Sequence, residues 1–258
     1  MEQDYTINEL LACVISRDLN DGDQVIAGAN AMVPRAGTFL AHFHHGPNMR
    51  VMGTNVFDFP RIQVGDTAQL FSKYNEYNRR HEEGFDRKTI KKGGTRDAFF
   101  FGGIQFDKYG NINMFGVGND YKHLKFRGPG GIGLANVCTH IRRMYLWATD
   151  HTKRRFVEKV DYISAVGFGD GPDFRKKWGL PGGGPRWCIS PIAIMDFDEK
   201  TKRMRLKSVH PGVTVDRVVE NTGFELIIPE KVPTTEPPTS EELHILRTKV
   251  DPDGALRK

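Results

Sequence analysis

The chain has 258 residues, of which 38% are hydrophobic and 27% charged, and its formal net charge is +5. Its 17 Phe, 7 Tyr and 3 Trp residues provide large core side chains, which excludes disorder over the whole length. No stretch approaches the roughly 18 apolar residues that a membrane span needs, and the acidic start of the chain argues against a secretory signal. Three widely spaced cysteines cannot form a disulfide framework, so we expect a soluble protein of the cytoplasm. The chain length fits one large domain or two smaller ones.

The basic residues are spread along the chain in short runs, such as Arg142-Arg143 and Arg175-Lys176-Lys177. Runs of this length are typical of solvated faces. A nucleic-acid groove more often shows one clustered stripe of positive charge with aromatic residues between the cations. We therefore expect neither a nucleic-acid partner nor a membrane.

The N-terminal third predicts a βαβ unit. Thr6-Ile7-Asn8-Glu9 has the form of a capping box and begins a helix. A short strand over 24–27 ends in Gly28-Ala29-Asn30, a second helix follows, and a strand over 49–52 ends in Gly53-Thr54-Asn55. Parallel strands bind ligands beyond their carboxyl ends, so we expect substrate contacts at Gly28 and Asn30.

The rest of the chain predicts strands and helices around the same sheet, and the fold class is therefore α/β, with an open, largely parallel sheet and flanking helices. Residues 1–228 are expected to form the main domain, and residues 229–258 a Pro-rich strap and a C-terminal helix with its own capping box. Residues 60–97 are polar and cannot be assigned. The remaining expected elements are a strand over 98–101, a helix beginning near 134, a strand over 144–148, a hairpin joining 192–197 to 204–206, and a helix from Thr214 to Gly223.

The glycine-rich segment Gly128-Pro129-Gly130-Gly131-Ile132-Gly133 is the best local candidate for a binding site. A glycine turn that leads into a helix exposes backbone N–H groups, which suit a phosphate or an oxyanion. The spacing fits neither a Walker loop nor a dinucleotide fingerprint, and a plain tight turn is an equally good interpretation. His42, His44 and His45 lack nearby acidic or thiol ligands, so no metal site is expected there.

Several segments resemble the β subunit of glutaconate CoA-transferase, a class I CoA-transferase. They keep that family's order and are Phe101 to Asn113, Phe126 to Gly131, Lys153 to Tyr162, Asp170 to Pro172, Gly179 to Gly182, Phe197 to Met204 and Glu220 to Phe224. Two later pieces, His210 to Thr214 and Leu243 to Pro252, are more similar to the β subunits of steroid-ring-opening CoA hydrolases.

The resemblance implies an open α/β subunit that works with a homologous α subunit and binds acyl-CoA between the two. In true transferases of the family a β-subunit glutamate attacks the thioester. Counted without gaps from Pro47, that glutamate falls on Thr54, and no Asp or Glu lies between Asp23 and Asp58. We expect Thr54 and Asn55 to play only a supporting part, as hydrogen-bond donors to a substrate carbonyl or to water.

The missing carboxylate favours hydrolytic carbon–carbon cleavage of a β-keto-type acyl-CoA, as in steroid degradation, with the acid/base residue on the α subunit. The backbone of Gly128, Gly130 and Gly131 would then hold the thioester or enolate oxygen, and CoA phosphates explain the basic excess. No cofactor is expected beyond the CoA of the substrate. Three alternatives stay open: a CoA-transferase that uses Asp58 or an α-subunit carboxylate, a decarboxylase of short acyl-CoAs, and a non-catalytic scaffold.

Overall fold

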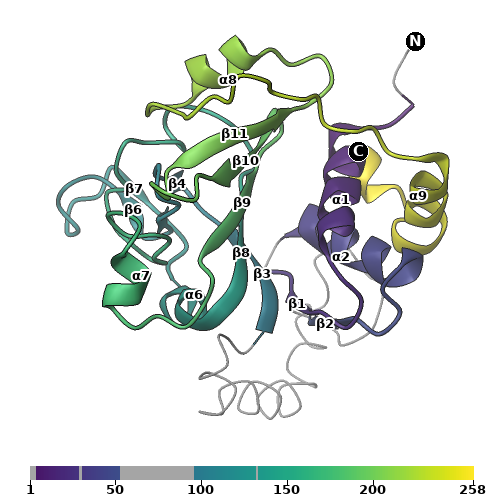
Figure 1. The fold of residues 1–258 in the computed structure, drawn as a ribbon, viewed down its shortest axis with the longest axis horizontal. Helices are drawn as coiled ribbons and strands as arrows, with labels where there is room; N and C mark the ends of the chain where they lie inside the picture. The colour runs from purple at the N-terminus through teal and green to yellow at the C-terminus, as the bar shows by residue number, and fades with distance from the viewer. Residues whose placement is uncertain (1–3, 29–30, 53–95, 132) are drawn as a thin grey trace. The chain divides into compact units, whose positions relative to one another are not determined.

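The computed structural model describes residues 4–28, 31–52, 96–131 and 133–258 (Figure 1). Contacts within the chain divide these residues into two compact units. The first unit contains the described residues up to 52, residues 96–100 and residues 236–258. The second unit contains residues 101–235. None of the described helices is both long enough and apolar enough to cross a bilayer.

The first unit contains the predicted βαβ arrangement. Its elements are α1 (Ile7–Asp18), β1 (Gln24–Ile26), α2 (Met32–His44), β2 (Arg50–Met52) and the first residues of β3 (Arg96–Gly102). Strand β1 pairs in parallel with both β2 and β3. The apolar faces of α1 and α2 pack against each other, with Leu11, Ile15 and Leu40 fully buried. Strands β1 and β2 therefore run in the same direction, as predicted, and their carboxyl ends lie at the same edge of the sheet.

Helix α1 and the C-terminal helix α9 (Ser240–Ile245) are joined by a reciprocal pair of buried carboxylates. Glu9 closes the capping box of α1 with Thr6 and also accepts a hydrogen bond from Arg247 Nε at 2.8 Å. Glu242 closes the capping box of α9 and accepts one from Arg17 Nη2 at 2.6 Å. Both predicted capping boxes are confirmed. Beyond α9 the chain continues as a π-helical turn (Leu246–Val250) and a short 3₁₀ turn (Ala255–Arg257).

The Glu242→Gln substitution should destabilise the first unit by about 2 kcal/mol at neutral pH, because it removes a charge-assisted hydrogen bond to Arg17. Burial raises the pKa of Glu242, but the hydrogen bonds from Arg17 and Thr239 outweigh it, and the pKa lies below its ordinary value. The stabilisation is thus present above the ordinary pKa and is lost as the pH falls through the lowered one. Chemical denaturation at several pH values measures this difference.

Glu241→Gln is the matched control for that substitution. The Glu241 side chain is 74% exposed, and its carboxylate lies 3.8 Å from the His44 ring. It should change the free energy of unfolding by less than about 0.5 kcal/mol. Equal effects of the two substitutions would contradict the importance of the Arg17–Glu242 pair.

The second unit is built on a mixed sheet. Strand β8 (Ile141–Trp147) pairs in parallel with β9 (Pro185–Ile189), and β9, β10 (Ala193–Phe197) and β11 (Met204–Val209) follow in antiparallel order. Together with β1, β2 and β3 these strands confirm the predicted class, an open and largely parallel sheet with flanking helices. Two small antiparallel pairs join β4 (Gln105–Phe106) to β5 (Ile112–Asn113) and β6 (Gly116–Val117) to β7 (Phe126–Arg127).

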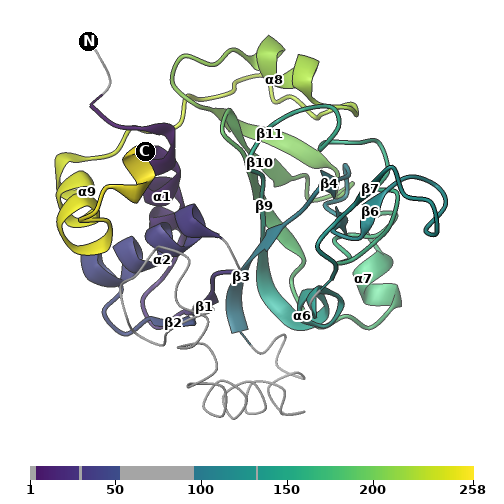
Figure 2. The same cartoon turned by 180° about the vertical axis from the view of Figure 1, so that it is seen from behind.

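Three short helices complete the second unit, namely α6 (Leu134–His140), α7 (Phe174–Lys177) and α8 (Val215–Asn221) (Figure 2). The predicted strap runs along edge strand β11, where the Thr235 amide donates to the Val209 carbonyl oxygen at 2.8 Å. The boundary expected after residue 228 falls inside this unit, and residues 236–258 pack with the N-terminal helices instead. The predicted β10–β11 hairpin and the helix capped by Thr214 are confirmed.

A buried histidine lies in the core of the second unit. His151 is 7% exposed, its two ring nitrogens lie 2.8 Å from Ser190 Oγ and 3.0 Å from Thr222 Oγ1, and its ring stacks on Phe156. Burial is the main reason that its pKa is lowered to about 4. The folded protein therefore holds this imidazole neutral over most of the pH range.

Acidification should destabilise the protein through His151. Between pH 6.5 and about 4 the unfolded chain binds a proton on this residue and the folded chain does not. The free energy of unfolding therefore decreases as the pH is lowered through this window, by about 3 kcal/mol in total. When the pH is lowered from 7 to 4, a His151→Gln variant should lose about 3 kcal/mol less stability than the parent. Urea denaturation at the two pH values measures both losses. His123→Gln, at an 82% exposed side chain, should keep the parental slope.

Candidate functional site

The strand end at Gly28 brings two backbones close together in the first unit. A Cβ built on Gly28 would lie 2.8 Å from the Phe100 carbonyl oxygen of β3, so only glycine allows this approach. The other residues predicted at this edge, Asn30, Thr54 and Asn55, lie outside the described residues. Substrate contact at these four positions stays a prediction.

The glycine loop, residues 128–133, connects β7 to α6 in the second unit. Its first half folds back on residues 114–115, because the Gly128 amide donates to Phe115 O at 2.8 Å and the Gly130 amide to Met114 O at 3.0 Å. A Cβ on Gly128 would lie 2.2 Å from Met114 O, so this position requires glycine. The first half of the loop is therefore a hydrogen-bonded turn whose path is fixed by backbone contacts.

The three glycines predicted to bind substrate differ in what their amides do. Those of Gly128 and Gly130 are already donated within the fold. The Gly131 amide donates to no other described residue, and Gly131 is half-buried beside the ring of Phe115. Among these three glycines, Gly131 is the one whose amide has no partner in the described part of the chain.

The resemblance predicts that this loop holds the thioester oxygen of an acyl-CoA. On that prediction the Gly128→Ala substitution should lower kcat/KM for the acyl-CoA by about 100-fold, because the new methyl group would push the loop away from Met114 and misplace the Gly131 amide by about 1 Å. Steady-state kinetics per folded enzyme measures this effect. Gly102→Ala is the control, since a Cβ there meets no atom within 4 Å and the Gly102 backbone lies outside the left-handed region. An unchanged kcat/KM in Gly128→Ala would show that the loop has no part in catalysis.

Arg175 fixes the other end of α6. Its guanidinium donates to the carbonyl oxygens of Cys138 and Thr139 at 3.0 and 3.1 Å, and also to those of Gly167 and Gly182, both at 3.0 Å. The residue is 7% exposed, and burial lowers the pKa of the guanidinium. The prediction that the 175–177 run forms a solvated face is wrong for Arg175, which holds the helix that follows the glycine loop. Lys176 and Lys177 are exposed as expected.

The hairpin that precedes the glycine loop exposes aromatic rings that the sequence did not single out. Tyr121 and Phe126 are 47% and 55% exposed, and the Arg127 guanidinium lies 5.1 Å from the Tyr121 ring centre. Exposed rings beside a cation are suited to stacking on a purine base. Aromatic residues next to basic ones in the 121–127 stretch are the signal that could have indicated this surface.

Metal-ligating side chains do not gather in the part of the chain that the structure describes. No three His, Cys, Asp or Glu residues lie together there. His45 binds the Leu19 carbonyl oxygen, and His44 lies near Glu241. Cys13, Cys138 and Cys188 are free thiols buried in the core. Burial raises the pKa of Cys13 to about 12, so this thiol is not an activated nucleophile.

The fold defines the class of protein to which the chain belongs. It is an α/β protein with an open, largely parallel sheet. The model of the coenzyme A transferase family matches residues 8–221. This chain belongs to that family.

Relatives with different reactions are similar to this chain over nearly its whole length. The β subunit of 3-oxoadipate CoA-transferase from Pseudomonas knackmussii is 38% identical over 256 residues, which are 94% of this chain and 92% of the relative. The cholesterol ring-cleaving hydrolase IpdB subunit of Rhodococcus jostii is 32% identical over 258 residues, 96% of this chain and 94% of the relative. The relatives that this chain resembles over nearly its whole length therefore include both a transferase subunit and a hydrolase subunit.

Glutaconate CoA-transferase of Acidaminococcus fermentans is similar in both sequence and structure. Its β subunit is 32% identical over 259 residues, 98% of this chain and 95% of the relative. Its crystal structure matches 99% of this chain and 98% of its own with a TM-score of 0.82. The fold expected from the resemblance is thereby confirmed.

Proposed function

We propose that this chain is the β subunit of a cytoplasmic α/β heteromer that cleaves a carbon–carbon bond of a β-keto-type acyl-CoA by hydrolysis, as in steroid degradation. One observation carries the proposal. The chain has no Asp or Glu between Asp23 and Asp58, the segment in which transferases of the family carry their glutamate. A threonine hydroxyl without a base is a poor nucleophile toward a thioester, so Thr54 cannot replace that carboxylate.

The reaction needs an oxyanion donor and a general base rather than a nucleophile on this chain. The oxygen of water adds to the β-keto carbon, and the bond between that carbon and the α-carbon breaks. The electron pair moves to the thioester as an enolate, which takes a proton at the α-carbon. The Gly131 amide would stabilise the enolate oxygen, and a carboxylate of the α subunit would remove the proton from water and return one to the α-carbon.

A CoA-transferase is the second candidate, and the 38% identity to the β subunit of a 3-oxoadipate CoA-transferase favours it. Its covalent step requires a carboxylate that attacks the thioester and releases CoA before CoA returns to the enzyme. In this chain Asp58 is the first acidic residue after Asp23, so Asp58 or an α-subunit carboxylate would have to serve.

The α/β complex distinguishes the two reactions when it is given a panel of β-keto acyl-CoAs and a second carboxylic acid in ¹⁸O-labelled water. For hydrolytic cleavage we expect one ¹⁸O atom in a new carboxylate of the cleaved product and no thioester of the second acid. A transferase gives that thioester without cleavage. Formation of the new thioester, detected by mass spectrometry, would overturn the hydrolytic proposal.

A further inference from the structure

Residues 114–116 of the second unit carry the carbonyl oxygens that hold the glycine loop. The Gly128 amide donates to the Phe115 oxygen at 2.8 Å, and the Gly130 amide donates to the Met114 oxygen at 3.0 Å. The strand that follows, β6, pairs with β7, which leads into the loop. We call residues 114–116 the loop support. The position of the glycine loop therefore depends on the groups that fix the loop support.

Asn113 is the first side chain that fixes the loop support, and it is 0% exposed. Its Oδ1 accepts from the amides of Phe115 at 2.9 Å and Gly116 at 3.3 Å. Its Nδ2 donates to the Gly116 carbonyl oxygen and to Gln105 Oε1, both at 2.7 Å. Both hydrogens of the amide group and both lone pairs of its oxygen are therefore used. An aliphatic side chain at this position would remove three hydrogen bonds to the backbone of the loop support.

Ser164 is the second side chain that fixes the loop support, and it is 1% exposed. Its Oγ accepts from the Met114 amide at 2.7 Å, and its own amide donates to the Ile112 carbonyl oxygen of β5 at 2.7 Å. Asn113 and Ser164 together hold the three amides of the loop support and its last carbonyl oxygen. The other two carbonyl oxygens accept from the glycine loop. Every backbone polar group of the loop support is therefore hydrogen-bonded.

The loop support also lies beside Gly131, whose amide has no partner in the described part of the chain. A Cβ built on Gly131 would lie 3.1 Å from the ring of Phe115. The backbone amide of Phe115 is one of those that Asn113 holds. A shift of the loop support would therefore move both the ring next to Gly131 and the oxygens that hold the first half of the loop.

We propose that Asn113 and Ser164 are positioning residues, which hold the loop support so that the Gly131 amide meets the thioester or enolate oxygen of the substrate. The inference rests on the proposed function, which supplies that oxygen. Both side chains are buried, so they act on the substrate only through the backbone of residues 114–116. Donors that stabilise a developing oxyanion act through their fixed position, and a displacement of about 1 Å costs about 100-fold in rate.

Hydrogen exchange of the intact α/β complex tests the structural half of the inference without any substrate. Mass spectrometry of a peptide over 127–131 reports on the amides of Gly128 and Gly130, which the loop support protects. We expect Asn113→Ala and Ser164→Ala each to speed the exchange of this peptide by at least about tenfold, because the loop support loses its hydrogen bonds. Ser164→Ala removes a single hydrogen bond and keeps the inference testable if Asn113→Ala does not assemble.

The matched controls are Asn111→Ala and Ser208→Ala. Asn111 is 2% exposed and uses its side chain as fully as Asn113 does, but its partners are Asp107 and the backbone of residues 167 and 169. Ser208 is a buried hydroxyl that pairs with Thr235. Neither side chain contacts the loop support through a hydrogen bond, so both controls should leave the exchange of the 127–131 peptide within about twofold of the parent.

Steady-state kinetics of the same complexes tests the catalytic half. Asn113→Ala should lower kcat for cleavage by about 10–100-fold and change KM by less than about threefold, because an oxyanion donor acts mainly in the transition state. Unchanged exchange in both test variants, equally fast exchange in the controls, or an unchanged kcat despite faster exchange would overturn the inference. A parent complex that cleaves no β-keto acyl-CoA would instead overturn the proposed function, and the exchange rates alone would then decide whether Asn113 and Ser164 hold the loop.

Discussion

The Arg175→Met substitution is expected to lower the free energy of unfolding by about 3–4 kcal/mol, more than the loss expected for Glu242→Gln. Arg175 is 7% exposed and donates to four carbonyl oxygens. Methionine fills a similar volume but donates no hydrogen bond, so these oxygens would lose the hydrogen bonds that the guanidinium donates to them inside the protein. The midpoint of thermal unfolding of the complex measures the loss.

Two variants make the Arg175 prediction specific. Lys176→Met changes an exposed neighbour and should alter stability by less than about 0.5 kcal/mol. Arg175→Lys keeps the charge but cannot reach four oxygens with one ammonium group, and it should recover only part of the loss. If Arg175→Met and Lys176→Met unfolded at the same temperature, the carbonyl contacts would not stabilise the fold as described.

The second large effect concerns the reaction itself. In the proposed reaction, removing the α-subunit carboxylate that would act as acid and base should reduce kcat by about 10²–10⁴-fold. Thr54→Val should reduce kcat/KM by less than about tenfold, because in the proposed reaction the hydroxyl only donates a hydrogen bond. Steady-state kinetics of cleavage, with both variants assembled into intact complexes, measures the contrast.

Two further variants of this chain serve as controls for that comparison. Asn55→Ala should behave like Thr54→Val if both side chains only support the substrate. Asp58→Asn should leave cleavage nearly unchanged, because the hydrolytic reaction has no use for a nucleophile at that position. A loss of about 10³-fold or more in Thr54→Val or Asp58→Asn would place the chemistry on this chain and contradict the assignment to the α subunit.

Local rules explain why much of the fold could be predicted from the sequence. The capping boxes at Thr6 and Thr239 and the turn between β10 and β11 depend on residues a few positions apart. The parallel pairing of β1 with β2 follows from the strand–helix–strand order. Features of this kind need no knowledge of distant contacts.

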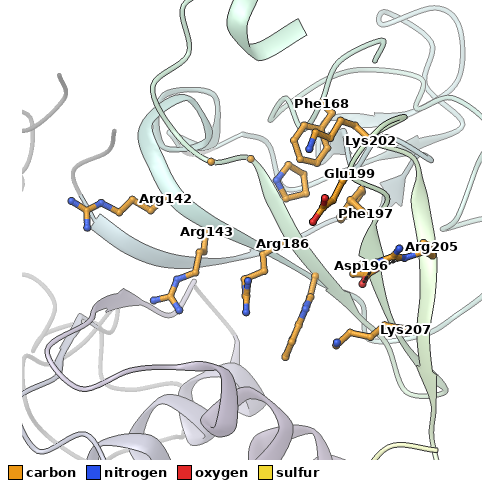
Figure 3. Close-up of a pocket in the computed structure, with 14 residues that line it drawn as sticks. Arg142, Arg143, Phe168, Arg186, Asp196, Phe197, Glu199, Lys202, Arg205 and Lys207 are labelled. Carbon is orange, nitrogen blue, oxygen red and sulfur yellow. Dashed lines mark hydrogen bonds and ion pairs between the residues drawn. The ribbon is translucent and has the colours of Figure 1, made fainter. Parts of the chain in front are cut away.

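Long-range contacts explain what the sequence could not show. The burial of Arg175 depends on carbonyl groups 8 and 36 residues away, and nothing in the run Arg175-Lys176-Lys177 distinguishes its first member. Arg142, Arg186 and Arg205 likewise line one depression although they come from three different strands, β8, β9 and β11 (Figure 3). For the glycine loop, the sequence indicated the segment but not which amide stays available, since that depends on the carbonyl oxygens of Met114 and Phe115.

The proposed hydrolysis requires that this chain carries no nucleophile toward the thioester. Mass spectrometry of the chain, after the α/β complex has been mixed with acyl-CoA and quenched in acid, measures whether such a nucleophile reacts. We predict an unmodified mass for every peptide between Asp23 and Asp58 and for the intact chain, with or without hydroxylamine treatment. A CoA adduct on a carboxylate of this chain that hydroxylamine removes would contradict the account and identify the enzyme as a transferase.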